Sequence, residues 1–451
     1  MILSNFTKEL FNFEVLRRNI SKILSLLLLF VTFQNGFCQS KVPQLSHDVA
    51  TKWFELQLQL IPRTPGFTPP VVSRALGYSG LTLYESLVHG MPHYKSLTGE
   101  LQELNKLPLP EKDQTYDWEI VANNAQSEII LALYSSNNKE NTSIITELKD
   151  AINLKLKKGV NEKIYKASVK YGEEIANAIY KYSKNDGGHN AEKNNFPKDF
   201  KASPGSCMWT PIGNQSALQP YWGSNRTFIK GNADFDLPIP PKCDIGNSSL
   251  MFSQAVEVYS VGKNLSEEQK EIALFWADDA GKTFTPPGHG VSIALQLIKK
   301  ENFNLEKTAE TLCRIGIAVN DAFISCWKCK FKYNILRPTS FIQTTIDPNW
   351  KSLLENPPFP EYTSGHGTVS GAIAAVLSDM FGYNYHFVDN SHEARGLKPR
   401  SFDSFFEFAQ EAALSRLYGG IHYRMSNEEG LKNGKRIGKI ACELKLKMKD
   451  S

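Results

Sequence analysis

Apolar residues recur at three- and four-residue spacing through most of this chain, and that spacing is typical of amphipathic α-helices. In the N-terminal half it predicts helices at residues 47–60, 70–90, 117–134, 142–157 and 162–183. In the C-terminal half it predicts helices at 248–260, 267–277, 290–299, 305–331, 349–355, 367–381, 403–418 and 427–448. The two-residue alternation that marks half-buried strands is scarce. The sequence therefore predicts an all-α protein.

A stretch rich in glycine, proline and asparagine separates the two helical halves. It runs from about residue 185 to 241 and contains two aromatic segments, Trp209-Thr210-Pro211 and Pro220-Tyr221-Trp222-Gly223. This composition favours turns and irregular loops. Nothing in it marks an exposed linker. We therefore expect two packed helical bundles with a long irregular central connection, forming one domain from residue 39 to 451.

The first 38 residues have the three-part pattern of a secretory signal peptide. Basic residues between Arg17 and Lys22 precede an apolar run at 23–33, and Gly36-Phe37-Cys38 supplies small residues at the −3 and −1 positions. The apolar run is too short to span a bilayer. A lipid-modified Cys38 is disfavoured because bulky Phe37 precedes it. We expect cleavage after Cys38, export to the periplasm or beyond the cell, and no transmembrane segment in the mature chain.

The charge and the cysteines exclude several classes of protein. The net charge is +4, and loss of residues 1–38 lowers it to +2, so nothing indicates a nucleic-acid partner. Six cysteines remain, too few for a disulfide scaffold, although an exported protein can oxidise a pair. Cys326 and Cys329 form a C-x-x-C that lacks the second pair or histidine of a zinc site. We expect them to be buried thiols on a helix.

Three segments of the C-terminal half carry the residues that could bind an anion, and the first runs from Cys326 to Pro338 (CWKCKFKYNILRP). Lys330 and Arg337 are seven residues apart, so we expect both on nearly the same helical face, with the helix ending before Pro338. Two stacked cations repel each other unless an anion or acids lie nearby. The alternative is a solvated basic stripe, since other lysines flank Lys330.

The second segment is PPFPEYTSGHGTVSGAIAAVL, residues 357–377. Ser364-Gly365-His366 directly precedes a helical run of small residues. The N-terminus of a helix presents free N–H groups to an anion. Gly365 allows close approach of the backbone, Ser364 adds a hydroxyl, and His366 can exchange protons near neutral pH. The alternative is an ordinary capped helix with a surface histidine.

The third segment is SRLYGGIHYR, residues 415–424. Arg416 offers a planar guanidinium suited to an oxyanion, and Gly419-Gly420 allows the chain to turn so that His422 points back toward the same centre. The alternative is a helix C-terminus where arginine and histidine meet exposed carbonyls.

Together these motifs, Lys-x6-Arg-Pro, Ser-Gly-His and Arg-x5-His, resemble the signature of the type 2 phosphatidic acid phosphatase superfamily. That superfamily includes lipid phosphatases, bacterial acid phosphatases and vanadium-dependent haloperoxidases. Trp327 and Phe359 occupy places where chloro- and iodoperoxidases have aromatic residues lining the halide pocket. The stretch from Trp276 to Gly290 also resembles the bacterial haloperoxidases. The whole pattern most resembles the bacterial vanadium-dependent iodoperoxidases.

The resemblance implies a vanadate cofactor, and phosphate fits the same donors. His422 would bind vanadium through a ring nitrogen, His366 would bond the axial oxygen and exchange protons, and Lys330 would polarise bound peroxide. The implied cofactor-binding residues are Lys330, Arg337, Ser364, Gly365, His366, Arg416 and His422. Hydrogen peroxide and a halide would be the substrates, with iodide first and bromide open. A secreted acid phosphatase with a histidine nucleophile, and a purely anion-binding protein, remain the alternatives.

Three further residues qualify this interpretation. Thr363 stands where the family often has proline, which would loosen the loop or add a hydroxyl near the cofactor. Asp321 would either neutralise one of the arginines from behind or be a surface acid. His289 would either line the pocket entrance or be structural or exposed.

Overall fold

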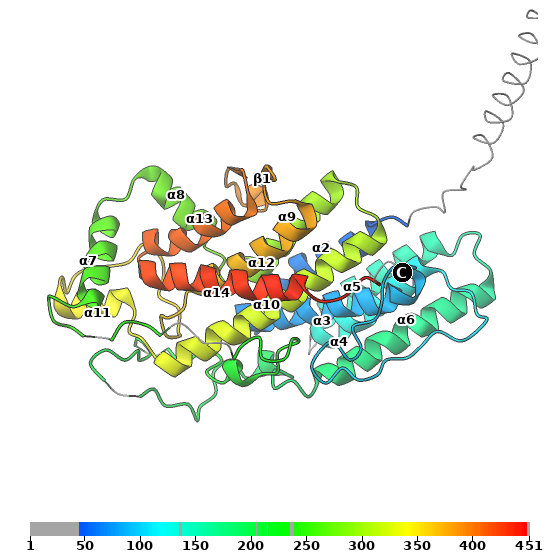
Figure 1. Ribbon diagram of the computed structural model, residues 1–451, viewed down its shortest axis with the longest axis horizontal. Coiled ribbons are helices and arrows are strands. Elements are labelled where there is room, and N and C mark those ends of the chain that lie inside the picture. The colour runs from blue at the N-terminus through cyan, green and yellow to red at the C-terminus, as the bar shows by residue number, and fades with distance from the viewer. Residues whose placement is uncertain are drawn as a thin grey trace, which may run out of the picture. The chain divides into compact units, whose positions relative to one another are not determined.

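The computed structural model describes residues 45–134, 138–203, 205–213, 215–234, 239–242 and 244–448. The proposed signal peptide and its cleavage site lie outside these residues, so both stay predictions. Leu45–Ser451 forms one compact unit, built mainly of helices (Figure 1). Among the described residues, no helix is both long enough and apolar enough to cross a membrane.

The N-terminal half is a group of helices built around α3 and α4. Its helices are α2 (Asp48–Leu60), α3 (Pro69–Leu87), α4 (Trp118–Tyr134), α5 (Lys139–Leu156) and α6 (Glu162–Ser183). Helix α6 buries Tyr171, Ile175 and Ile179 along one face. Gly172 lies on that face, and a Cβ there would come within 2.4 Å of the Val121 carbonyl oxygen of α4. The absence of a side chain at Gly172 therefore lets α4 and α6 pack closely.

The C-terminal half surrounds the long helix α10, which also packs against α3 (Figure 1). Its helices are α7 (Leu250–Lys263), α8 (Glu267–Phe275), α9 (Thr285–Lys300), α10 (Leu305–Tyr333), α11 (Pro338–Thr345), α12 (Gly365–Phe381), α13 (Phe405–Tyr418) and α14 (Arg424–Cys442). Two short strands, β1 (Phe387–Asp389) and β2 (Arg400–Phe402), form an antiparallel pair. Helix α10 is buried along most of its length, so it is the central element of this half. The prediction of an all-α protein is confirmed.

The described parts of the central stretch follow an irregular path, as expected, apart from short 3-10 turns at Ala191–Lys193 and Trp222–Ser224. Trp209 and Trp222 are buried and anchor this path to the helices. The Trp209 amide donates to the Asn334 carbonyl at 2.8 Å, just beyond the end of α10. Cys207 takes part in a disulfide bond.

The structure corrects the prediction that Lys330 and Arg337 share a helical face. Helix α10 ends at Tyr333, because Asn334 adopts a left-handed conformation with φ of 48°. Arg337 is instead the N-cap of α11. Pro338 begins α11 rather than ending a helix, since proline is tolerated in the first helical turn.

Other predicted boundaries also shift. The segment 349–355 is not helical, and α9 starts at Thr285 because Pro286 and Pro287 lie in its first turn. Helix α14 begins and ends earlier than the predicted 427–448.

Candidate active site

A cavity of about 360 Å³ brings residues of all three motifs together. Its wall includes Trp327 of α10, Phe359 of the loop before α12, Gly365 and His366 at the start of α12, Arg416 of α13, and His422 before α14. These residues come from positions almost a hundred apart in the chain. The cavity therefore brings residues of all three motifs to one place in the fold, although Lys330, Arg337 and Ser364 are not among those that line it.

Lys330 and Arg337 are fully buried behind the loop that precedes α12. The Lys330 ammonium donates to the carbonyls of Pro360, Glu361 and Thr363 at 3.1, 3.0 and 2.6 Å. Arg337 donates from Nε to the Phe359 carbonyl at 2.8 Å. In this structure the two cations hold the backbone of the loop in place, and neither forms part of the cavity wall.

Arg337 also ties this loop to the third motif. Its Nη1 donates to the Ile421 carbonyl at 2.9 Å, directly before His422. An arginine has five N–H donors, and Arg337 bonds with its Nη2 to only one further carbonyl, that of Pro360, at 3.4 Å. Among the described residues, two of its N–H bonds have no acceptor, although Arg337 does not line the cavity in this structure.

His422 is held in one orientation by Glu361, a residue that the sequence analysis did not single out. The Glu361 carboxylate lies 2.8 Å from His422 Nδ1 and accepts the Tyr423 amide at 3.0 Å. The same oxygen, Oε1, faces Nδ1 and accepts the amide, so with Glu361 ionised Nδ1 carries the proton and Nε2 keeps its lone pair. Because His422 lines the cavity, Nε2 is the nitrogen that can bind a metal there.

His366 and Gly365 present the N-terminus of α12 to the cavity. Ser364 is the N-cap, and its hydroxyl accepts the Gly367 amide at 3.3 Å. Among the described residues, the buried Nε2 of His366 has no hydrogen-bond partner. A Cβ built on Gly365 would meet only Trp327, at 4.0 Å, so this glycine borders open space. A free ring nitrogen and an open helix N-terminus together suit an oxyanion.

Arg416 adds a cation directly to the cavity wall. Its Nε donates to the Ser415 hydroxyl at 3.0 Å and its Nη2 to the Ala273 carbonyl at 3.1 Å. These two bonds aim the guanidinium from α13 toward the cavity that it lines. Burial lowers the pKa of Arg416 to about 10, so the group is charged at neutral pH.

The electrostatics of the site favour a negatively charged occupant. Burial lowers the pKa of Lys330 to about 8 and that of Arg337 to about 10. Burial and the surrounding cations hold the pKa of His422 well below its ordinary value. Glu361 touches His422, and burial raises the pKa of Glu361 to about 7. Asp278 and Asp279 also line the cavity, beside Arg416. An oxyanion would be attracted by Lys330, Arg337 and Arg416, and the donors present fit vanadate or phosphate.

The two predicted halide-pocket residues lie side by side. The rings of Trp327 and Phe359 are 4.9 Å apart between centroids. Phe359 also lies 5.1 Å from Lys330 Nζ and 4.9 Å from the Arg337 guanidinium carbon. Lys330 and Arg337 therefore make cation–π contacts with Phe359, a ring that lines the cavity, in addition to their hydrogen bonds to the loop backbone.

The structure decides several of the alternatives left open by the sequence. The Thr363 hydroxyl faces Thr368 and Cys326, so it does not supply a donor to the cavity. Both Cys326 and Cys329 are buried free thiols, as predicted.

Both interpretations of Asp321 are wrong. It is buried, and its carboxylate accepts the amides of Phe228 and Ile229 at 2.8 and 3.1 Å. It therefore fixes the central stretch rather than an arginine. His289 is a structural histidine, buried between the carboxyl groups of Asp278 and Asp389.

Comparison with known proteins independently shows which proteins this chain resembles. A model of the second helical-bundle domain of VCPO matches residues 310–450. The vanadium chloroperoxidase of Curvularia inaequalis is 26% identical over 217 residues, which span 35% of this chain and 36% of that protein. The match thus covers about a third of the length of that relative.

Solved structures resemble a much larger part of the chain. The crystal structure of the first bacterial vanadium-dependent iodoperoxidase is 33% identical, with a TM-score of 0.80, covering 88% of this chain and 96% of that one. A holo-type bacterial vanadium-dependent chloroperoxidase shares the fold at 16% identity, with a TM-score of 0.67 and coverage of 85% and 93%.

Proposed function

Because this chain belongs to the vanadium-dependent haloperoxidase family, we propose that it oxidises halide with hydrogen peroxide, and that iodide is the preferred halide. The observation that supports the proposal best is the cavity that brings Arg416, the N-terminus of α12 and the Nε2 atoms of His366 and His422 to one place. The overall reaction combines hydrogen peroxide, halide and one proton to give hypohalous acid and water.

The proposed cofactor is vanadate, bound by His422 through Nε2. Arg416 and the Gly365 amide would bond its oxygens from the cavity wall. Arg337 and Ser364, which do not line the cavity in this structure, are proposed as further donors because their motifs resemble those of the family. When bound, vanadate supplies a Lewis acid that activates peroxide toward attack by halide. Lys330 would contribute its positive charge from behind the loop. A direct contact between Lys330 and peroxide would require release of one of its three carbonyl bonds.

His366 would act as the general base and then as the general acid of the reaction. Burial and the Arg416 guanidinium hold the pKa of His366 well below its ordinary value, so the free ring is neutral and can accept a proton from incoming peroxide. The protonated ring can then return that proton to the departing oxygen. Its Nε2 has no competing partner among the described residues.

The preference for iodide rests on the pocket and on one relative. Trp327 and Phe359 offer a wall of aromatic rings, whose positive edges suit a large and weakly hydrated anion. Iodide is also the easiest of the common halides to oxidise. The structural relative at 33% identity is described as an iodoperoxidase.

Iodide oxidation by the mature chain tests the proposal, measured with peroxide before and after addition of orthovanadate. We expect activity only after vanadate is added, and its loss in His422→Ala. His386→Gln is a matched control, since His386 pairs with Asp403 at the surface. Hydrolysis of a chromogenic phosphate ester, inhibited by vanadate and without iodide oxidation, would contradict the proposal and favour the phosphatase.

A further inference from the structure

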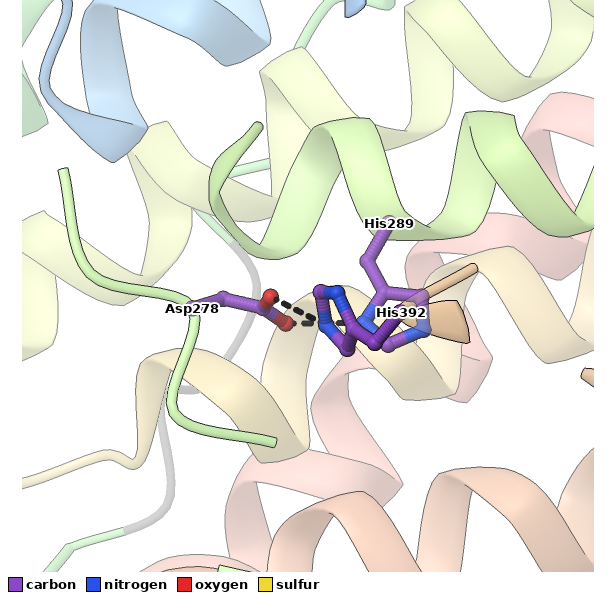
Figure 2. A group of neighbouring side chains, drawn as sticks. All are labelled: Asp278, His289 and His392. Carbon is purple, nitrogen blue, oxygen red and sulfur yellow. Dashed lines mark hydrogen bonds and ion pairs between the residues drawn. The ribbon is translucent and has the colours of Figure 1, made fainter. Parts of the chain in front are cut away.

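A buried chain of carboxyl and imidazole groups reaches the cavity through Asp278, which forms part of its wall. His289 lies between two carboxylates, with Nδ1 2.8 Å from Asp278 Oδ2 and Nε2 2.8 Å from Asp389 Oδ2. His392 Nε2 lies 3.0 Å from the other oxygen of Asp278, Oδ1. Figure 2 shows both rings directed at the Asp278 carboxylate. All four side chains are almost completely buried.

The hydrogen bonds indicate where the protons are. A carboxylate only accepts, so His289 must carry a proton on each ring nitrogen to satisfy both of its partners. Although burial disfavours the charged ring, Asp278 and Asp389 raise the pKa of His289 to about 10. The Arg395 guanidinium, which can only donate, lies 3.3 Å from Nδ1 of His392. Nδ1 of His392 therefore accepts, and its Nε2 donates to Asp278.

The same three residues could in principle hold a metal ion, because one ligand atom from each of Asp278, His289 and His392 lies within 4.8 Å of the others. The geometry favours a hydrogen-bonded network instead. The two histidines bond to different oxygens of Asp278, and each places a proton on the nitrogen that a metal would need. The hydrogen bonds among Asp278, His289, Asp389 and His392 therefore pair the imidazole N–H groups with carboxylate oxygens and require no metal ion.

We propose that His289 and His392 are positioning residues that hold Asp278 as a carboxylate in the cavity wall, where it supports protonation of His366 during turnover. The inference rests on the proposed function, because that function gives His366 its proton-exchanging role. The titratable or charged groups around Asp278 are Asp279 of its own loop, His289 of α9, His366 of α12, Asp389 of β1, His392 and Arg395 after β1, and Arg416 of α13.

Protonation of His366 needs a nearby negative charge because the ring is buried. Asp278 and His366 line the same cavity. Burial, Arg416 and the charge of His289 disfavour a proton on the His366 ring, whereas the charge of Asp278 favours it. Burial alone would raise the pKa of Asp278, but His289 and His392 hold it far below its ordinary value. Without the two histidines, Asp278 would take up a proton itself, and His366 would lose its negative neighbour.

The test is an NMR titration of ¹⁵N-labelled histidines in the full mature chain, saturated with inorganic phosphate. We expect Asp278→Asn to lower the proton affinity of His366 about tenfold, which moves its inflection down by about one pH unit. His289→Gln and His392→Gln should each give part of this shift, and the double variant nearly all of it. In the Asp278→Asn background, His289→Gln should not lower the inflection further, since its supporting effect acts through Asp278 and the charge of His289 itself disfavours a proton on His366.

Controls separate this role from a general structural one. His386→Gln, at an exposed His–Asp pair, should leave the inflection unchanged. In the wild type, His289 should show two protonated ring nitrogens at pH 8, a readout that needs no variant to fold. Two outcomes would overturn the proposal: a folded double variant with the wild-type inflection, or zinc retained by the wild type through dialysis and lost from His289→Gln. Phosphate serves as the probe, so absence of iodide oxidation would refute the proposed function alone.

Discussion

Gly365 and Gly367 lie two residues apart in the first turn of α12, yet the structure predicts opposite effects for alanine at the two positions. A Cβ at Gly365 would meet only Trp327, at 4.0 Å, which is an ordinary contact. A Cβ at Gly367 would lie 2.7 Å from the Asn427 carbonyl oxygen of α14. Gly365→Ala therefore intrudes on the cavity, whereas Gly367→Ala intrudes on the packing of two helices.

The magnitudes follow from these contacts. Gly365→Ala should leave the free energy of unfolding unchanged or raise it by up to about 1 kcal/mol, because the unfolded chain loses conformational freedom. It should weaken vanadate binding by roughly 10- to 100-fold, the cost of about one hydrogen bond to a charged group. Gly367→Ala should cost about 1–3 kcal/mol of stability through overpacking.

Urea unfolding and equilibrium dialysis with orthovanadate measure the two quantities for each variant. The reasoning is refuted if Gly365→Ala binds vanadate as tightly as the wild type, since Gly365 would then not border the anion. It is equally refuted if Gly365→Ala is the less stable of the two proteins.

Further substitutions test other parts of the site. Glu361→Gln should weaken vanadate binding by roughly 10- to 100-fold, because His422 loses its charged partner. Phosphate, which forms no bond to the His422 ring, should lose less affinity. Equal losses for both anions would contradict the role of Glu361 in orienting His422. Phosphate affinity should fall as the pH rises above about 8, where Lys330 of the free site loses its proton, and Lys330→Met should remove that dependence in a calorimetric titration. Asp321→Ala should destabilise the fold by about 1–3 kcal/mol, because the buried Phe228 amide and the part-buried Ile229 amide lose their acceptor. An unchanged vanadate affinity would confirm that Asp321 acts on the fold alone.

The sequence predicted the helical fold because α-helical periodicity is local. Helices α6 and α10 could be assigned from the spacing of their own apolar residues. Helix α11 was missed because Pro338 was interpreted as ending a helix, although proline also fits the first turn of a new one. The end of α10 was misplaced for a related reason, since the left-handed Asn334 gives only a weak signal in the sequence.

The motif residues of the site could be predicted because their types and spacing are distinctive, but their partners could not. Glu361 supports His422 across 61 positions of the chain, and Asp278 meets His392 across 114. Such pairs depend on how α8, α9 and the loops pack together, which no local pattern reveals. The same holds for Lys330, whose three acceptors are backbone carbonyls that carry no sequence signal.

The most direct measurement is X-ray absorption at the vanadium edge of the protein reconstituted with one equivalent of orthovanadate. If His422 Nε2 binds vanadium within this cavity, the spectrum will show a single imidazole nitrogen among oxygen neighbours, and that nitrogen will be absent in His422→Ala. A wild-type spectrum with oxygen neighbours alone, or one that His422→Ala leaves unchanged, would contradict the assignment of His422 as the metal ligand.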